Sequence, residues 1–125
     1  MEGVAFSLCD SFEIFREMNA AIEKIRLGGG GAKSVLWRQI QADVYGQTVE
    51  TIAAEEGAAF GAALLARVGA GAWKSVDEAC EKTIRVAERI KPRVDSSEIL
   101  NRNYRAYKLL YAARRPAMKI ITGEK

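Results

Sequence analysis

The stretch LGGGGAKS, residues 27–34, has the residue types and spacing in this chain that are best suited to ligand chemistry. Its four glycines are followed by Ala32, Lys33 and Ser34, where a helical pattern begins. Because glycine has no Cβ, a flat ring or a phosphate can touch the main chain, and N–H groups at a helix start attract anions. A tight turn with a capping serine is the simpler alternative, but one glycine would suffice for it. The run therefore favours a binding site.

The spacing excludes three common motifs. A Walker A loop requires glycine at two positions that hold Leu27 and Ala32 in this chain. The last glycine of a GxGxxG fingerprint is replaced by Ser34, and Glu50 is only a loose match for its acidic residue. No GxSxG nucleophile elbow is present. If the loop binds a nucleotide, it does so in another way.

The elements before the loop follow from apolar spacing. An amphipathic helix is predicted over residues 4–18, with one apolar stripe formed by Leu8, Phe12, Phe15 and Met18. Residues 24–27 then alternate charged and apolar side chains and lead into the glycines. This alternation predicts a short strand that ends in the loop.

A helix is predicted directly after the loop. Leu36, Ile40 and Val44 recur every four residues, and Gly46 is placed to end the helix. The β-branched residues in Thr48–Ala54 predict a second strand. The next helix, residues 55–68, consists mostly of small side chains and begins with acidic residues that suit the helix dipole. Its glycines predict close packing against the sheet, and the residues concerned are Glu55, Glu56, Gly57 and Gly61.

The last third of the chain is mainly helical. Ser75 and Glu78 form a capping box for a short helix. The following TIRVAERIKP segment is ambiguous up to Pro92. Asp95 or Ser96 is expected to cap a long helix, whose core stripe is Leu100, Tyr104, Tyr107 and Tyr111. Strands alternate with helices overall, which predicts an α/β fold with a short parallel sheet flanked by helices.

Composition limits the class of protein. The 125 residues are 49% hydrophobic and 28% charged, which suits one globular domain. No apolar run is long enough to cross a bilayer and no signal sequence is evident, so a cytoplasmic protein without a membrane partner is expected. Cys9 and Cys80 are isolated and histidine is absent, which argues against a disulfide framework or a zinc site.

Charge is divided unevenly along the chain. Residues 1–80 carry seven basic and eleven acidic side chains, whereas residues 81–125 carry twelve and five. A basic half attracts polyanions, although the solvated face of a helix explains it equally. No nucleic-acid-binding motif is present, so a nucleic acid is not the expected partner.

Two long ordered runs and the terminal tyrosine helix carry a family resemblance. IRLGGGGAKSVLWRQIQADVYGQTVET closely resembles the adenosine-binding segment of the FGGY carbohydrate kinases, and among these the xylulose kinases most of all. EEGAAFGAALLARVGAGAW resembles the helix of small residues that follows this segment in the family. The resemblance implies part of a C-terminal domain of the ribonuclease H-like, actin-like ATPase fold. In that fold ATP binds, with Mg²⁺, in a cleft between two related domains.

The resemblance also assigns roles to residues of the loop. Gly29 and Gly30 would lie against the adenine and ribose, Gly31 and Lys33 would flank the nucleotide, and Ser34 would hydrogen-bond the adenine from the helix start. Gln39, Gln41 and Asp43 also match the family pattern, and we expect them to support the fold.

The resemblance further implies what the chain lacks. In the family the phosphate loop of the first domain, the sugar pocket and the catalytic aspartate precede the matching segment. The aspartates here, Asp10, Asp43, Asp77 and Asp95, have no matching catalytic context. Residues 1–125 are thus expected to be an incomplete nucleotide-binding domain of a kinase that transfers the ATP γ-phosphate to a sugar hydroxyl, with D-xylulose as substrate. By itself the chain is expected to be inactive.

Three further expectations remain open at this stage. An incomplete sheet would expose an edge and apolar faces, which predicts a homodimer or a larger homo-oligomer. The chain is alternatively a stand-alone module that binds a nucleotide or a small anion without catalysis. A third alternative is an interaction module that uses its basic half.

Overall fold

The computed structural model describes residues 1–53 and 57–123. In chain order the elements are α1 (Glu2–Glu17), β1 (Ile25–Leu27), the 3₁₀ helix η1 (Gly30–Lys33), α2 (Val35–Tyr45), β2 (Val49–Ile52), α3 (Gly57–Gly69), α4 (Val76–Thr83), β3 (Val86–Ile90) and α5 (Val94–Thr122). The chain therefore has the α/β architecture that the sequence predicts. None of the helices in these two ranges combines the length and the apolar character needed to cross a bilayer.

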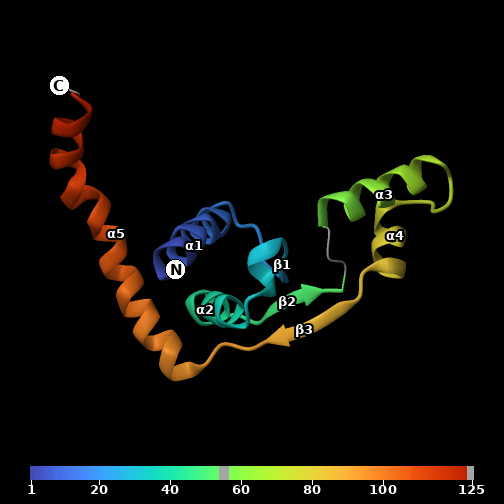
Figure 1. Cartoon of the computed structure of the whole chain (residues 1–125), viewed down its shortest axis with the longest axis horizontal. Helices are drawn as coiled ribbons and strands as arrows, with labels where there is room; N and C mark the ends of the chain where they lie inside the picture. The colour runs from blue at the N-terminus through green and yellow to red at the C-terminus, as the bar shows by residue number, and fades with distance from the viewer. Residues whose placement is uncertain (54–56, 124–125) are drawn as a thin grey trace.

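A three-stranded sheet in the order β1-β2-β3 lies at the centre of the molecule (Figure 1). β1 and β2 run parallel, with Ile25 opposite Val49, as the strand–helix–strand pattern predicts. β3 comes from the ambiguous TIRVAERIKP segment and runs antiparallel to β2, so the sheet is mixed rather than wholly parallel. Every second side chain of β1 and β2 is buried, which fixes their register.

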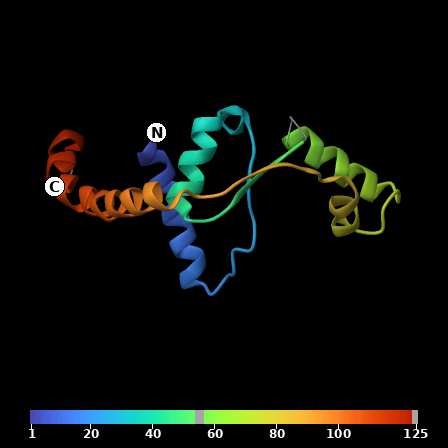
Figure 2. The ribbon, with the colours of Figure 1, turned by 90° about the horizontal axis from the view of Figure 1, so that it is seen from below.

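The core lies where α1, α2 and the first half of α5 meet the sheet (Figures 1 and 2). Leu100 and Tyr104 of the predicted stripe are buried there, Tyr107 packs partly against them, and Tyr111 is 71% exposed. The predicted stripe is therefore confirmed from Leu100 to Tyr107 and is wrong at Tyr111. At Tyr111 the helix α5 has already extended past the elements that cover its first half (Figure 1).

The buried face of α1 differs from the predicted one. Ala5, Phe6 and Cys9 are buried, whereas Leu8 and Phe15 of the predicted stripe are 43% and 47% exposed. The ring of Phe6 packs against α5, with its centroid 5.7 Å from that of Tyr104. Apolar residues at helical spacing lie on more than one face of α1. Contact with α5 therefore determines which of these faces is buried.

Helix ends agree with the sequence in most places. Gly46 ends α2 in the left-handed conformation, with φ 62°. Ser75 Oγ accepts the N–H of Glu78 at 3.1 Å, which confirms this half of the predicted capping box. The expected caps of α5 at Asp95 or Ser96 are wrong, since the helix begins at Val94 and Arg93 is its N-cap residue without a side-chain cap.

α3 and α4 contact each other more than they contact the other described elements. Both views show this pair of helices away from α1, α2 and α5 (Figures 1 and 2). The expected dipole role of Glu55 and Glu56 lies outside the described residues. A Cβ added at Gly57 or Gly61 would meet no atom within 4 Å. The predicted close packing at these two glycines is therefore wrong for this chain.

Candidate functional site

The glycine run connects β1 to α2 through one turn of 3₁₀ helix. Gly29 adopts φ 74° and ψ −178°, a conformation that is essentially restricted to glycine. The N–H of Ala32 then donates to the Gly29 carbonyl at 3.1 Å, and the N–H of Ser34 donates to the Gly31 carbonyl at 3.1 Å. The loop is therefore a compact turn whose shape depends on Gly29.

Ser34 is the N-cap residue of α2. Its backbone is extended and its Oγ accepts the N–H of Trp37 at 3.3 Å. This is the capping role that the sequence offers as one of two alternatives. The hydroxyl uses an oxygen lone pair for the cap and keeps its proton, so Ser34 retains a donor for a second partner.

A cavity of about 310 Å³ lies between the loop and the sheet. Its walls come from the loop, from the ends of β1 and β2, and from α2 and β3, and they include Leu27, Gly28, Gly29, Ala32, Lys33, Arg38, Thr51 and Ala87. It opens at the carboxyl ends of the parallel strands, where open α/β sheets bind ligands. Gly29 and Lys33 of the predicted site residues thus line one cavity.

Gly31 and Ser34 line a second hollow of about 290 Å³, together with Met1, Val4 and Trp37. A Cβ at Gly31 would lie 3.2 Å from two atoms of the Trp37 indole, so the glycine lets the ring lie against the loop. Gly30 is exposed and lines neither hollow, and a Cβ there would meet no atom within 4 Å. The five predicted residues therefore lie together in one turn, and four of them are divided between the two hollows.

Arg38 is a residue of this site that the sequence analysis did not single out. It comes one turn after Ser34 and lines the cavity with Gly29 and Lys33. Its guanidinium forms an ion pair with Glu88 of β3 through Nη1. Its position four residues after the N-cap was the available signal, because that spacing returns a side chain to the same helix face.

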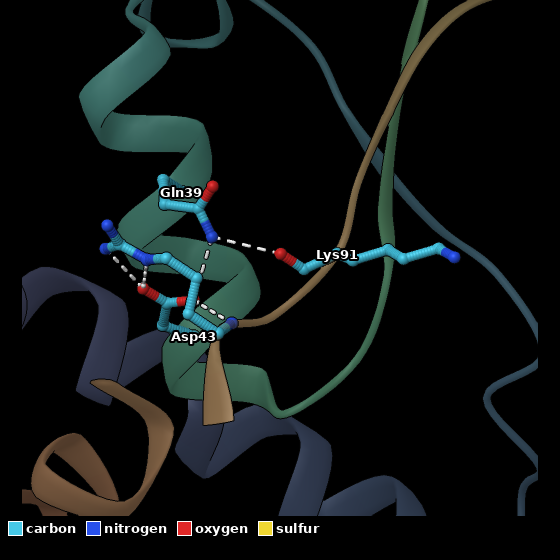
Figure 3. A network of polar contacts seen from close by, with 4 residues as sticks. Gln39, Asp43 and Lys91 are labelled. Atoms are coloured by element: carbon cyan, nitrogen blue, oxygen red, sulfur yellow. Dashed lines mark hydrogen bonds and ion pairs between the residues drawn. The ribbon is translucent and has the colours of Figure 1, made fainter. Parts of the chain in front are cut away.

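The other end of α2 is fixed to the start of α5 by Asp43, as Figure 3 shows. Asp43 is fully buried and accepts hydrogen bonds from the Gln39 side-chain amide at 2.8 Å and from the Arg93 N–H at 2.7 Å. Arg93 Nη2 also lies 2.7 Å from Oδ2, and Gln39 donates to the carbonyl of Lys91 at 3.0 Å. These bonds confirm that Gln39 and Asp43 support the fold.

The electrostatics of Asp43 follow from this network. Burial alone would raise the pKa of the carboxyl group, but the hydrogen bonds from Arg93 and Gln39 outweigh it and lower the pKa below its ordinary value of 3.8. Asp43 is therefore ionised at neutral pH and fully engaged. Gln41 has a similar supporting role, since its Oε1 accepts the Tyr45 hydroxyl at 3.1 Å.

A larger hollow of about 480 Å³ lies between α1, α2 and α5, away from the loop. Cys9 lines it, and burial raises the pKa of this thiol, which suits a packed side chain rather than a nucleophile. Lys108 on its rim pairs with Glu13 at 3.0 Å. No glycine lines this hollow, so it lacks the backbone access of the loop cavity.

No ready-made metal site is found among the residues that the structure describes. Within residues 1–53 and 57–123, no three side chains of the His, Cys, Asp or Glu type gather into a cluster that could hold an ion. Glu88, whose carboxylate pairs with Arg38 of the cavity wall, is already engaged.

Comparison with known proteins places the chain in a family. Residues 1–70 match the model of the FGGY family of carbohydrate kinases, C-terminal domain. The match includes α1, the loop and the strands on both sides of α2. The chain belongs to the FGGY family of carbohydrate kinases, as the glycine run and its flanking motifs predict.

Relatives of known name agree with this assignment. A xylulose kinase of Bacillus subtilis is 38% identical over 111 residues, which cover 89% of this chain and 22% of that protein. An L-xylulose/3-keto-L-gulonate kinase of Escherichia coli is 35% identical over 112 residues, covering 90% of this chain and 22% of that protein. The chain thus spans between a fifth and a quarter of the length of these relatives.

Solved structures confirm the fold. The crystal structure of xylulose kinase from Rhodospirillum rubrum superposes with a TM-score of 0.77 at 30% identity, over 92% of this chain and 23% of that one. A gluconate kinase from Lactobacillus acidophilus shares the fold, with a TM-score of 0.79 at 21% identity, over 90% of this chain and 23% of that one. The sequence-based fold class, part of a C-terminal domain of the actin-like ATPase fold, is confirmed.

Proposed function

We propose that residues 1–125 are an incomplete C-terminal domain of an ATP-dependent sugar kinase and supply part of its nucleotide site. In the full-length enzyme the γ-phosphate of ATP would pass to a hydroxyl of D-xylulose and give xylulose 5-phosphate. Similarity to two kinases of xylulose, at 38% and 30% identity, supports this choice of sugar. The observation that carries the proposal is the family match across the glycine loop.

Five loop residues have proposed roles in binding the nucleotide. Gly29 and Gly30 leave the main chain open, since a Cβ at either would meet no protein atom within 4 Å. Lys33 is exposed at the cavity and adds a positive charge for the phosphates. The Ser34 hydroxyl keeps its proton as a hydrogen-bond donor for the adenine, and the absence of a Cβ at Gly31 lets the Trp37 ring lie beside it. Backbone N–H groups at the start of a helix favour the anionic ligand.

The isolated chain is proposed to bind nucleotide without transferring phosphate. Phosphoryl transfer needs a base for the acceptor hydroxyl and a metal ion that neutralises the developing charge. Asp43, the buried aspartate on the helix after the loop, is engaged by Arg93 and Gln39 and cannot act as that base. The base, Mg²⁺ and the sugar pocket would come from the rest of the kinase.

Two assays on the 125-residue chain test this proposal. Titration with ADP, followed by ¹H–¹⁵N NMR, should shift the amide signals of the loop and of the first turn of α2 and should saturate. A coupled assay with ATP, Mg²⁺ and D-xylulose should show no turnover. The absence of a saturable shift at millimolar ADP would overturn the nucleotide site. Turnover above the background hydrolysis would overturn the proposed division of labour.

The genomic reading frame offers an independent test of the domain assignment. A DxGT-type phosphate loop encoded in frame upstream of Met1 would support a kinase of full length. An upstream frame that encodes no such loop would instead favour a stand-alone module that binds a nucleotide or a small anion.

We also propose that the isolated chain forms a homodimer or a larger homo-oligomer. Large apolar side chains are exposed on α1 and on the second half of α5, among them Leu109 at 70%, Tyr111 at 71% and Ile121 at 84%. Apolar surface of this kind favours association. Light scattering at 10-fold serial dilutions should give a mass above that of one chain, and a constant monomer mass would contradict the proposal.

A further inference from the structure

We infer that a groove between α1 and α5 binds a small amphipathic anion, which carries one negatively charged group on an apolar body, as a medium-chain carboxylate does. The groove has a volume of about 590 Å³ and is lined by Asp10 of α1 and by residues of the second half of α5. In this region α5 runs on past α1 (Figure 1). No residue of the glycine loop lines the groove, so the inference does not depend on the proposed nucleotide site.

The first observation is an apolar wall along one face of α5. It consists of Tyr107, Leu110, Tyr111 and Met118, all of which line the groove. They follow one another at helical spacings of three, four and seven residues and therefore lie on the same side of α5. Leu110 and Met118 are each 48% exposed, so the wall is accessible from solvent. Small-molecule pockets of about 300 to 1,000 Å³ are mostly lined by apolar and aromatic side chains of this kind.

The second observation is the charge inside the groove. Asp10 lines it but already accepts the hydroxyl of Tyr104 at 2.6 Å. Lys108 lines it but already pairs with Glu13 at 3.0 Å. Arg114 is exposed, lines the same groove and forms no ion pair with the described residues. The apolar wall therefore has one uncompensated positive charge beside it.

The third observation is the position of this charge on the helix. Arg114 follows Tyr107 by seven residues, which returns it to the same side of α5 and places it about 10 Å further along the axis. A ligand whose anionic group contacts Arg114 can lay its apolar body over Leu110 towards Tyr107. The guanidinium holds a carboxylate through two parallel N–H donors, so a carboxylate suits this position.

The charge of α5 also argues against a second copy of this helix as the occupant. Residues 99–122 carry six basic side chains and no acidic one. Two such helices in one groove would repel each other, whereas a single anion is attracted to it. The observations thus favour a small anionic ligand over self-association at this groove.

Titration of the 125-residue chain with octanoate, followed by ¹H–¹⁵N NMR, tests the inference. The amide signals of residues 107–118 should shift and should saturate. Octanol has the same apolar body without the charge, and we expect it to bind about tenfold more weakly. Acetate has the charge without the body and should give no saturable shift.

Arg114→Gln tests the role of the charge. We expect it to weaken octanoate binding about tenfold, through the loss of a charge-assisted contact, and to leave octanol binding unchanged. Arg115→Gln is the matched control, because Arg115 is the next residue, is also exposed and does not line the groove. It should leave the affinity for both ligands unchanged.

Leu110→Asp tests the apolar wall. It introduces a negative charge where the apolar body would lie and should abolish octanoate binding. Leu109→Asp makes the same change at a residue that is 70% exposed and does not line the groove, so this variant should still bind octanoate. The melting temperatures of both variants show whether a loss of binding is due to unfolding.

The outcomes separate a specific site from its alternatives. No saturable shift with octanoate, or equal affinities for octanoate and octanol, would contradict the inference. Equal losses in Arg114→Gln and Arg115→Gln would show a general attraction to a basic helix and would also contradict it. If Leu110→Asp instead lowers the mass measured by light scattering while octanoate fails to bind, the groove holds a second copy of the chain and the inference is wrong. ADP binding is measured separately, so each of these failures leaves the proposed function intact.

Discussion

At the scale of single residues, Asp43 determines how the helix after the loop is held. Its carboxylate joins α2 to the segment before α5, which lies 50 residues further along the chain. Gln39 and Arg93 both donate to this carboxylate, so each of its oxygens accepts hydrogen bonds in the charged form. Because the group is buried, the loss of that charge leaves the donors of Arg93 and Gln39 without a full acceptor set.

We expect Asp43→Asn to lower the free energy of unfolding by about 2 kcal/mol. The substitution replaces one carboxylate oxygen with an NH₂ group, which cannot accept the hydrogen bonds that this oxygen receives. Urea denaturation followed by circular dichroism measures the change. Asp77→Asn is the matched control, because Asp77 is exposed in the first turn of α4, and it should cost only a few tenths of a kcal/mol. Equal effects of the two substitutions would contradict the role of Asp43.

The same network predicts a dependence on pH. The pKa of Asp43 is lower in the folded chain than its ordinary value of 3.8, so the unfolded chain binds the proton more readily. The stabilisation is therefore present above about pH 4 and is lost as the pH falls through the lowered pKa. Denaturation curves from pH 7 to pH 2 should show a steeper acid loss for the wild type than for Asp43→Asn. Parallel profiles would argue against it.

Residues of the site were predicted unevenly from the sequence. The glycine run and Ser34 are local signals, since strand, turn and cap follow one another within ten residues. Arg38 and Glu88 are 50 residues apart, and their pairing depends on β3, which no local pattern identifies. The roles of the five loop residues in binding a nucleotide stay predictions until the titrations are done.

At the scale of elements, the turn between β1 and α2 depends on one glycine more than on the other three. Gly29 has a positive φ, with ψ near 180°, whereas Gly30 adopts a conformation open to other residues and has free space where a Cβ would lie. Within the run of four glycines, Gly29 is therefore required by its backbone conformation, whereas Gly30 leaves the main chain accessible.

Alanine substitutions separate these two properties. Gly29→Ala should destabilise the chain by about 2 kcal/mol, because its backbone conformation is almost inaccessible to a residue with a Cβ. Gly30→Ala should be neutral or stabilise by about 0.5 kcal/mol, by reducing the freedom of the unfolded chain. Thermal melts of the two variants provide the comparison, and a larger loss for Gly30→Ala would show that the turn is arranged differently.

The elements with a strong apolar periodicity were predicted correctly from the sequence. The prediction failed where contacts with a distant part of the chain determine the strand pairing or the buried face. The strands at 25–27 and 49–52 and the helix that ends at Gly46 lie within their predicted segments. The β3 segment was ambiguous in the sequence, and its burial pattern does not alternate, with one buried residue, Ile90, at its end. The buried face of α1 was shifted by its contact with α5, which is remote in sequence.

At the scale of the whole molecule, the helices are not packed equally well against the core. The core joins α1, α2, the sheet and the first half of α5. Leu64 and Ala79 are buried in the α3–α4 pair and do not belong to that core. Among the described residues, α3 and α4 have few contacts with the elements of that core, and they lie apart from them in Figure 1.

Hydrogen exchange should reflect this difference. Amide protons of α2 and β2 are expected to exchange at least tenfold more slowly than those of α3 and α4, because opening of the outer pair exposes little of the core. Mass spectrometry of deuterium uptake, resolved by peptide, measures both sets in one experiment. Uniform protection over all four elements would show that the chain opens as a single unit.

The separation of the α3–α4 pair from the core has a practical consequence for handling the chain. A protease that cuts within residues 70–75, the exposed connection between the two helices, would sever no element of the core. The nicked product would stay together as two pieces, joined by the backbone bonds between β2 and β3 and by the packing of α5 on α1 and α2, and its glycine loop would keep its shape.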